Sequence, residues 1–260
     1  MIHNIINFSN VSVIRDNKKI LKDINIDINA NENIIILGPN GSGKSTFLKL
    51  LTRQIYPSYT DDNTICKVCD QTVWDISALR HLMGIVSNDM QYDFNFEITG
   101  YETVLSGFFG SIGLFTNHKV TDTMIEKAKQ MIDFLEISHL QNKYMNIMSA
   151  GENKKFLIAR ALVSEPKILV LDEPTNNLDI AASKKLKIIL QKIIAHKTNV
   201  ICITHQVSDI IPEISRIIMF KDGQVFRDGV VNEVLTSKNL SSLFNIDVEL
   251  MKNQEGYLII

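Results

Sequence analysis

A segment near the N-terminus has the composition of a loop that binds phosphate groups. Gly38-Pro39-Asn40-Gly41-Ser42-Gly43-Lys44-Ser45 fits the pattern G-x-x-x-x-G-K-[ST] at every fixed position. Its glycines allow successive backbone N–H groups to curl around phosphates, and the N-terminus of the following helix, which begins near Thr46, adds a positive dipole end. We expect all of these residues to bind a nucleoside triphosphate, with Lys44 reaching the β- and γ-phosphates and Ser45 binding Mg²⁺.

Two carboxylates follow an apolar run later in the chain. The run Ile168-Leu169-Val170-Leu171 is typical of a strand buried on both faces, and Asp172 and Glu173 come directly after it. Ligands bind at the carboxyl edge of a parallel sheet. We therefore expect Asp172 to hold Mg²⁺ and Glu173 to act as general base on the water that attacks the γ-phosphate. For this pair alone, a solvated acidic turn is the alternative.

A histidine closes a second apolar run. His205 follows Val200-Ile201-Cys202-Ile203-Thr204, which is again typical of a buried strand. A single histidine is more often structural than functional. Because this one lies at a strand end of the same predicted sheet, we expect its imidazole to accept or relay a hydrogen bond at the γ-phosphate.

The elements that position these residues indicate an α/β fold. Alternating apolar and polar residues over 5–28 predict an antiparallel sheet with one wet face. The apolar run at 34–37 predicts a buried strand leading into the phosphate loop, and a helix follows the loop. Residues 57–72 are polar and predict irregular structure, whereas residues 97–164 are mostly helical by spacing and predict a separate lobe. Strand, helix and strand over 168–204 imply a parallel core.

Composition limits the function. The chain has 260 residues, 45% of them hydrophobic, and a formal net charge of −2, so a globular protein is expected and nucleic-acid binding is not. Three cysteines do not make a disulfide framework, which favours the cytoplasm. Cys66 and Cys69 are half of a zinc site, and we expect no zinc there. The chain shows no signal peptide and no apolar run near the roughly 18 residues that cross a bilayer, so work at a membrane requires a partner that spans it.

The order of the motifs resembles the nucleotide-binding domain of an ABC ATPase. After the phosphate loop come Met148-Ser149-Ala150-Gly151-Glu152 (the signature segment), Leu171-Asp172-Glu173-Pro174-Thr175, Asn177-Leu178-Asp179 and Thr204-His205. This resemblance covers nearly the entire chain and implies a single ABC ATPase domain over residues 1–260. The fold it implies is an α/β P-loop NTPase core with an N-terminal antiparallel β-subdomain and an inserted α-helical lobe. The β-subdomain and RecA-like core would take about 1–95 and 166–260, and the lobe about 96–165.

The resemblance also implies a dimer. Two such domains pair head to tail and trap each ATP between the phosphate loop of one and the signature segment of the other. Ser149 and the backbone of Gly151 would then donate to the γ-phosphate in trans, and Asp179 would couple the two sites. A second copy of this chain is the expected partner.

Several positions depart from the usual family pattern. Met148, Ala150 and Glu152 replace Leu, Gly and Gln in the signature segment, and Glu152 brings an anion near a triphosphate. Arg15 lies about where an aromatic residue usually stacks on adenine, and a guanidinium plane can stack on a base as well. The family's glutamine, which links Mg²⁺ to the membrane partner, corresponds to Asn88 by counting, with Gln91 as the competing choice.

Two segments remain to be assigned. Residues 104–115 include three Phe and three Gly and no charged residue. In the family, a permease helix docks in this region. We expect Phe108 and Phe109 to dock the permease; the alternative is that they fill the lobe. Asn153, Lys154 and Lys155 are expected to form an exposed helix start.

The function implied by the resemblance is Mg²⁺-dependent ATP hydrolysis that powers movement of a small solute, by import, through a separate membrane permease. The chain looks like the molybdate-type and the iron-chelate and cobalamin importer ATPases. It would work in the cytoplasm, peripherally at the inner face of the membrane. One alternative is a soluble ABC ATPase with no permease, serving assembly, regulation or nucleic-acid-linked work. Another is a nucleotide-sensing module that turns over slowly.

Overall fold

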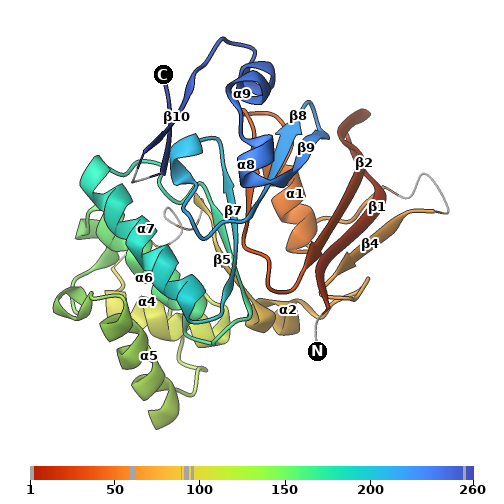
Figure 1. Cartoon of the computed structure of the whole chain (residues 1–260). Coiled ribbons are helices and arrows are strands. Elements are labelled where there is room, and N and C mark those ends of the chain that lie inside the picture. The colour runs from red at the N-terminus through yellow and green to blue at the C-terminus, as the bar shows by residue number, and fades with distance from the viewer. Residues whose placement is uncertain (1–2, 59–62, 89, 91–93, 95–96, 254–255) are drawn as a thin grey trace. The chain divides into compact units, whose positions relative to one another are not determined.

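A computed structural model describes residues 3–58, 63–88, 90, 94, 97–253 and 256–260. It divides into two compact units (Figure 1). The first unit combines Met1–Ile76 with Asn199–Ile260, and the second is Ser77–Thr198. Because strands and helices both build the units, the α/β class expected from the sequence is confirmed.

An antiparallel sheet forms the N-terminal part of the first unit. Its strands are β1 (Asn4–Arg15), β2 (Lys18–Asn29) and β4 (Ile65–Val68), in the order β2-β1-β4. Along β2 the side chains of Ile24, Ile26 and Ile28 are buried and the residues between them are exposed, so the predicted one-sided sheet is confirmed. The prediction of irregular structure throughout 57–72 was wrong. The alternation in β4 extends over only four residues, which is too short a pattern to separate from a polar loop.

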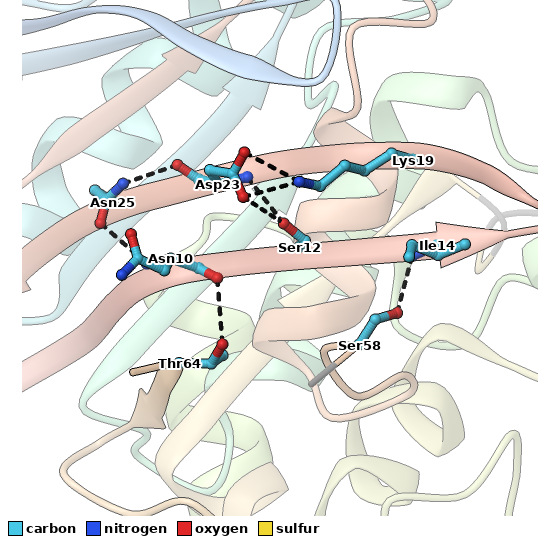
Figure 2. A network of polar contacts seen from close by, with 8 residues as sticks. All are labelled: Asn10, Ser12, Ile14, Lys19, Asp23, Asn25, Ser58 and Thr64. Carbon is cyan, nitrogen blue, oxygen red and sulfur yellow. Dashed lines mark hydrogen bonds and ion pairs between the residues drawn. The ribbon is translucent and has the colours of Figure 1, made fainter. Parts of the chain in front are cut away.

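Side-chain hydrogen bonds brace the β1–β2 pair where its register shifts (Figure 2). Asn10 and Asp23 have φ of 53° and 52°, in the left-handed region. Ser12 Oγ donates to Asp23 Oδ1 and accepts from the Asp23 N–H, both at 3.0 Å. Lys19 Nζ donates to the same carboxylate at 2.9 Å, and the Asn10 N–H donates to Asn25 Oδ1 at 3.0 Å. These bonds fix the shape of β2, which contacts the phosphate loop.

Parallel strands form the core of the first unit. The strand β3 (Ile34–Leu37) lies between β7 (Asn199–Thr204) and β8 (Arg216–Lys221) and is parallel to both, and β9 (Gln224–Val230) is antiparallel to β8. All four residues of β3 are buried, as the apolar run predicts. Helix α1 (Lys44–Leu51) follows β3, and the ring of Phe47 contacts those of Phe8 and Phe220 at centroid distances of 5.8 and 5.2 Å.

The second unit is mainly helical, as the spacing over 97–164 predicts. Among the residues of this unit that the structure describes, strands β5 (Met83–Val86) and β6 (Ile168–Asp172) are paired in parallel. Helix α6 (Ala150–Leu162) packs against α4 (Gly100–Ser106), α5 (Asp122–Phe134) and α7 (Ile180–Ala195). Among the described residues, none of the helices is both long enough and apolar enough to span a membrane. The remaining elements at Ile76–Ile147 are α2 (Ile76–Leu82), η1 (Gly107–Phe109), η2 (Ser138–Leu140) and η3 (Met145–Ile147). The remaining elements of the first unit, all after Asn199, are η4 (Val207–Asp209), α8 (Val231–Val234), α9 (Ser237–Phe244), β10 (Leu250–Asn253) and β11 (Gly256–Ile259).

Candidate functional site

The phosphate loop joins β3 to α1 and can be built only with glycine at several positions. A Cβ on Gly38 would lie 2.4 Å from the carbonyl oxygen of Phe220 and 2.7 Å from Ser42 Oγ. Gly41 and Gly43 have φ of 80° and 104°, which L side chains rarely adopt. The conformation of this backbone therefore excludes larger residues, by crowding or by strain, at these glycines of the loop.

Neighbouring strands hold the loop in place. The Gly223 N–H, from the turn between β8 and β9, donates to the carbonyl oxygen of Ser42 at 3.1 Å. The carbonyl oxygen of Gly223 accepts from the Lys22 N–H of β2 at 2.8 Å. A Cβ on Gly43 would lie 2.7 Å from Leu21 Cδ2, so the loop is packed tightly against β2.

The donors of the loop fit a phosphate group. The N–H groups in the first turn of α1 have no acceptors within the helix, and the N-cap residue Gly43 provides no side chain to satisfy them. Ser42 Oγ is buried and finds no hydrogen-bond partner among the described residues. Lys44 Nζ, on a buried side chain, donates to the carbonyl oxygens of Gly38 and Pro39 at 2.8 and 3.0 Å. A positive dipole end, a buried hydroxyl and an ammonium group together suit an anionic phosphate.

In the first unit, His205 follows a strand that is paired with the strand leading into the phosphate loop. His205 follows Thr204, which pairs with Leu37 at the end of β3. The Gly38 N–H donates to the carbonyl oxygen of Thr204 at 3.3 Å, so the histidine leaves the sheet beside the first glycine of the loop.

Arg15 lies at the tip of the β1–β2 hairpin. Its side chain is exposed, and the turn that follows has φ of 49° at Asp16 and 59° at Asn17. Val13, two residues earlier, pairs with Leu21, which contacts Gly43. The hairpin therefore runs past the phosphate loop before it reaches Arg15.

In the second unit, two amides hold the carboxylate of Glu173. Asp172 ends β6, and Glu173 follows in the left-handed region with φ of 47°. Glu173 Oε2 accepts from Asn88 Nδ2 and from Asn176 Nδ2, both at 3.3 Å. Asn88 is thus brought to the acidic strand end, whereas the competing Gln91 lies outside the described residues. No pattern in the sequence predicts the role of Asn176.

A lysine that was expected on the surface lies beside this carboxylate. Lys154 Nζ donates to Asn88 Oδ1 at 3.3 Å, and the residue is only 1% exposed. Burial lowers the pKa of Lys154, while the charges of Asp172 and Glu173 act in the opposite direction. The expected exposed start of α6 was wrong, since Asn153 is buried as well. Lys154 has helical spacing to Leu157, Ile158 and Ala161, which are buried on the same face, and that periodicity was visible in the sequence.

The signature segment forms the N-terminus of α6 through a capping box. Ser149 is the N-cap, its Oγ accepts from the Glu152 N–H at 3.3 Å, and Glu152 Oε2 accepts from the Ser149 N–H at 2.8 Å. Lys143 Nζ donates to the same carboxylate at 3.0 Å. The bond from the Ser149 backbone, and after it the bond from Lys143, lowers the pKa of Glu152. The pattern Ser-x-x-Glu before an apolar run predicts such a box.

Asp179 lies next to the signature segment. Its Oδ1 accepts from the Ala182 N–H at 2.7 Å and caps α7. A Cβ on Gly151 would lie 3.0 Å from Ala182 Cβ, so α6 and α7 approach closely at their N-termini. Ser149, Gly151 and Asp179 line one cavity of 230 Å³ in the second unit.

The uncharged run over 104–115 is only partly exposed. Phe108 and Phe109 are half-buried, and the ring of Phe109 stacks on His118 at a centroid distance of 4.1 Å. Ile112 and Phe115 are 44% and 59% exposed. Arg160 of α6 donates to the carbonyl oxygen of Ser111 at 3.0 Å and ties this loop to the helix.

The cysteine pair is enclosed. Cys66 and Cys69 are both buried, and burial raises the pKa of both thiols, that of Cys69 to about 11. Metals bind the thiolate, which a raised pKa disfavours. That no zinc binds here stays a prediction.

Known proteins resemble this chain along most of its length. The family model described as ABC transporter matches residues 21–176. The uncharacterized ABC transporter ATP-binding protein YlmA of Bacillus subtilis is 33% identical over 255 residues, which cover 96% of this chain and 95% of YlmA. The hemin import ATP-binding protein HmuV of Hahella chejuensis is 27% identical over 252 residues, 93% of each chain.

Solved structures agree with these relatives. The structure of cbiO1 from Clostridium perfringens, part of the ABC transporter complex cbiONQ, has a TM-score of 0.77 and 26% identity over 94% of this chain and 95% of cbiO1. A dimeric structure of the ATP-binding cassette MJ0796, bound to ADP and Pi, has a TM-score of 0.69 and 25% identity over 87% of this chain and 98% of that one. The predicted fold and ATP hydrolysis are thereby confirmed. The chain belongs to the ABC transporter family, among the ATP-binding subunits that hydrolyse ATP to power transport through a permease.

Proposed function

We propose that this chain hydrolyses MgATP as one half of a dimer and powers import of a small solute through a separate permease. The observation that carries the proposal is the phosphate loop, in which the buried hydroxyl of Ser42 and the N–H groups at the N-terminus of α1 can donate hydrogen bonds to an anion. Its glycines are required by the backbone, as the chemistry of a phosphate cradle demands.

The first unit binds the nucleotide. The residues from Gly38 to Thr46 surround the phosphates, and Lys44 contacts the β- and γ-phosphates. Arg15, exposed at the hairpin tip, stacks on the base through its planar guanidinium. His205 hydrogen-bonds at the γ-phosphate, which is supported by its departure from the sheet beside Gly38.

The second unit supplies the base. Glu173 takes a proton from the attacking water as that water bonds to the γ-phosphorus and the bond to the leaving oxygen breaks. Ser45, Asp172 and Asn88 would hold Mg²⁺, because hydroxyl, carboxylate and amide oxygens are the hard ligands that Mg²⁺ prefers. Asn88 Oδ1 accepts from Lys154 and has a second lone pair for the metal. When bound, the ion neutralises charge on the β- and γ-phosphates.

A second copy of the chain completes each site. Ser149 and Gly151 donate to the nucleotide of the partner, and Asp179 couples the two sites. Their shared cavity supports a common role. Ile147 and Ile180 are 64% and 81% exposed beside these segments, and large apolar side chains of this kind are covered at interfaces. The dimeric relative supports the same assembly.

The relatives support the proposals that a permease is the partner and that transport is by import. HmuV is named for hemin import, and cbiO1 is part of a transporter complex. We therefore place the chain in the cytoplasm, peripherally at the membrane, and assign docking to the helical lobe, about residues 96–165.

The test of the catalytic assignment uses Glu173→Gln, which keeps the size and removes the basic group. We expect ATP binding to be retained, turnover to fall by about 100-fold or more, and a dimer to accumulate in MgATP. Glu126→Gln, an exposed change on α5, is the matched control and should behave as wild type. Normal turnover by Glu173→Gln would contradict the base assignment.

A further inference from the structure

Helix α6 carries a buried lysine that the proposed function does not use. Lys154 is 1% exposed, and a lysine is almost never buried this fully unless it is paired. The groups that face its ammonium are the amide oxygen of Asn88, at 3.3 Å, and the charges of Asp172 and Glu173. All four residues belong to the second unit.

The lysine and the carboxylate of Glu173 select the same orientation of the Asn88 amide between them. Oδ1 faces the ammonium of Lys154, and Nδ2 therefore faces the carboxylate of Glu173, at 3.3 Å. The reverse orientation would set the amide oxygen against a carboxylate and the NH₂ group against a cation, so both contacts would become repulsive. The amide is thus a dipole aligned between a buried cation and an anion.

We propose that Lys154 is a positioning residue for ATP hydrolysis, which orients Glu173 through the Asn88 amide. The inference rests on the proposed role of Glu173 as the base. Lys154 acts through Asn88 and does not itself contact the reacting atoms. It fixes one amide that holds Oε2, and the amide of Asn176 is another.

Glu173 depends on such support. Its backbone is in the left-handed region with φ of 47°, and the hydrogen bonds from Asn88 and Asn176 to its carboxylate are long, at 3.3 Å each. Without the cation, the Oδ1 end of the Asn88 amide loses its donor, so the amide holds its NH₂ group against the carboxylate less firmly. A displacement of about 1 Å at a catalytic group is enough to cost about 100-fold in rate.

Lys154→Met is the first test, because methionine fills a similar apolar volume without a charge or a donor. We expect kcat for ATP hydrolysis to fall by about 10- to 100-fold, while KM and directly measured ATP affinity stay within about twofold of wild type. Lys154→Gln is the second variant; its amide carries no charge and can turn either its oxygen or its NH₂ group toward Asn88, so it anchors Oδ1 less firmly, and kcat should again fall by about tenfold. Lys129→Met, an exposed lysine on α5, is the matched control.

A double-mutant cycle with Asn88→Ala tests the route. If Lys154 acts through Asn88, then Lys154→Met adds little to the loss already caused by Asn88→Ala. Wild-type kcat in either Lys154 variant, or losses that multiply in the double variant, would overturn the proposal; if the methionine variant does not fold, the glutamine variant decides. Glu173→Gln is measured in parallel. Normal turnover there would mean that the base assignment has failed, whereas an inactive Glu173→Gln beside a fully active Lys154→Met means that only the positioning role has failed.

Discussion

The carboxylate of Glu152 accepts a hydrogen bond from the backbone N–H of Ser149 at 2.8 Å, so its charge is directed at the start of its own helix. Lys143 also donates to this carboxylate. An acidic residue in the signature segment was the feature of the sequence most at odds with binding a triphosphate. The capping box gives that residue a structural purpose, because an anion stabilises the N-terminus of a helix.

Removing the carboxylate should therefore cost stability. We expect Glu152→Ala to lower the free energy of unfolding by about 1 kcal/mol, in the usual range for a lost cap. Glu152→Gln keeps an oxygen that accepts from Ser149 and should lose less. Urea unfolding of both variants and wild type measures the difference. An alanine variant as stable as wild type would show that the box contributes nothing.

The same contact predicts a pH dependence. The folded protein lowers the pKa of Glu152 below its ordinary value of 4.5. A lowered carboxyl pKa means that the stabilisation is present above the unfolded pKa and is lost as pH falls through the folded pKa. The stability difference between wild type and Glu152→Ala should thus be constant near pH 7 and shrink below about pH 4.5. The stability difference between Glu152→Gln and Glu152→Ala should not shrink in this way, because the glutamine side chain does not titrate. Urea titrations at several pH values test this, and a difference that grows on acidification would contradict it.

The contact between α6 and α7 is a second point of sensitivity. Gly151→Ala brings a Cβ to 3.0 Å from Ala182 Cβ, closer than such atoms normally approach. We expect the two helix N-termini to move apart, with a loss of about 1 kcal/mol in stability and a several-fold loss of ATPase activity. Adding Ala182→Gly restores the space, so the double variant should recover both. Failure of the double variant to recover activity would mean that Gly151 acts through its backbone rather than through packing.

Much of this fold was predictable because the pattern of the sequence is strong where elements are buried. The runs at 34–37, 168–171 and 200–204 are strands, as predicted. The strand β4 was missed since its four residues alternate too briefly. The prediction that Lys154 is exposed was wrong because it relied on the charge of the side chain and not on its helical spacing to buried residues. Charged side chains are usually exposed, but those that are paired can be buried.

The candidate site was predictable to a different degree in each unit. The phosphate loop follows from a motif whose glycines the backbone needs. The amides around Glu173 could not be predicted, because Asn88 and Asn176 meet the carboxylate from separate segments and asparagine is common in polar loops.

The glycines of the phosphate loop should differ in cost. Gly38→Ala places a Cβ 2.4 Å from a backbone carbonyl oxygen, so the loop must shift and we expect ATP affinity to fall by about 100-fold or more. Gly41→Ala meets open space and has only the strain of a φ of 80°, about 1 to 2 kcal/mol. Its ATP affinity should fall less. Direct nucleotide binding by the two variants measures this, and equal affinities would contradict the crowding at Gly38.

The exposed part of the uncharged loop should decide docking to the permease. Ile112 and Phe115 are 44% and 59% exposed, so Ile112→Ser and Phe115→Ser together remove the apolar surface that a membrane partner would cover. Because neither side chain belongs to the ATP site, we expect ATPase activity of the purified chain to be unchanged and the membrane protein that copurifies in mild detergent to be lost.

Phe109 differs, since its stacking on His118 holds the loop itself, and Phe109→Ala should cost about 1 kcal/mol of stability as well. Ile188→Ser, an equally exposed change on α7, is the matched control and should leave copurification intact. A permease retained by the double variant would exclude this loop as the docking surface, and soluble companions alone with the wild type would favour an ATPase that works without a permease.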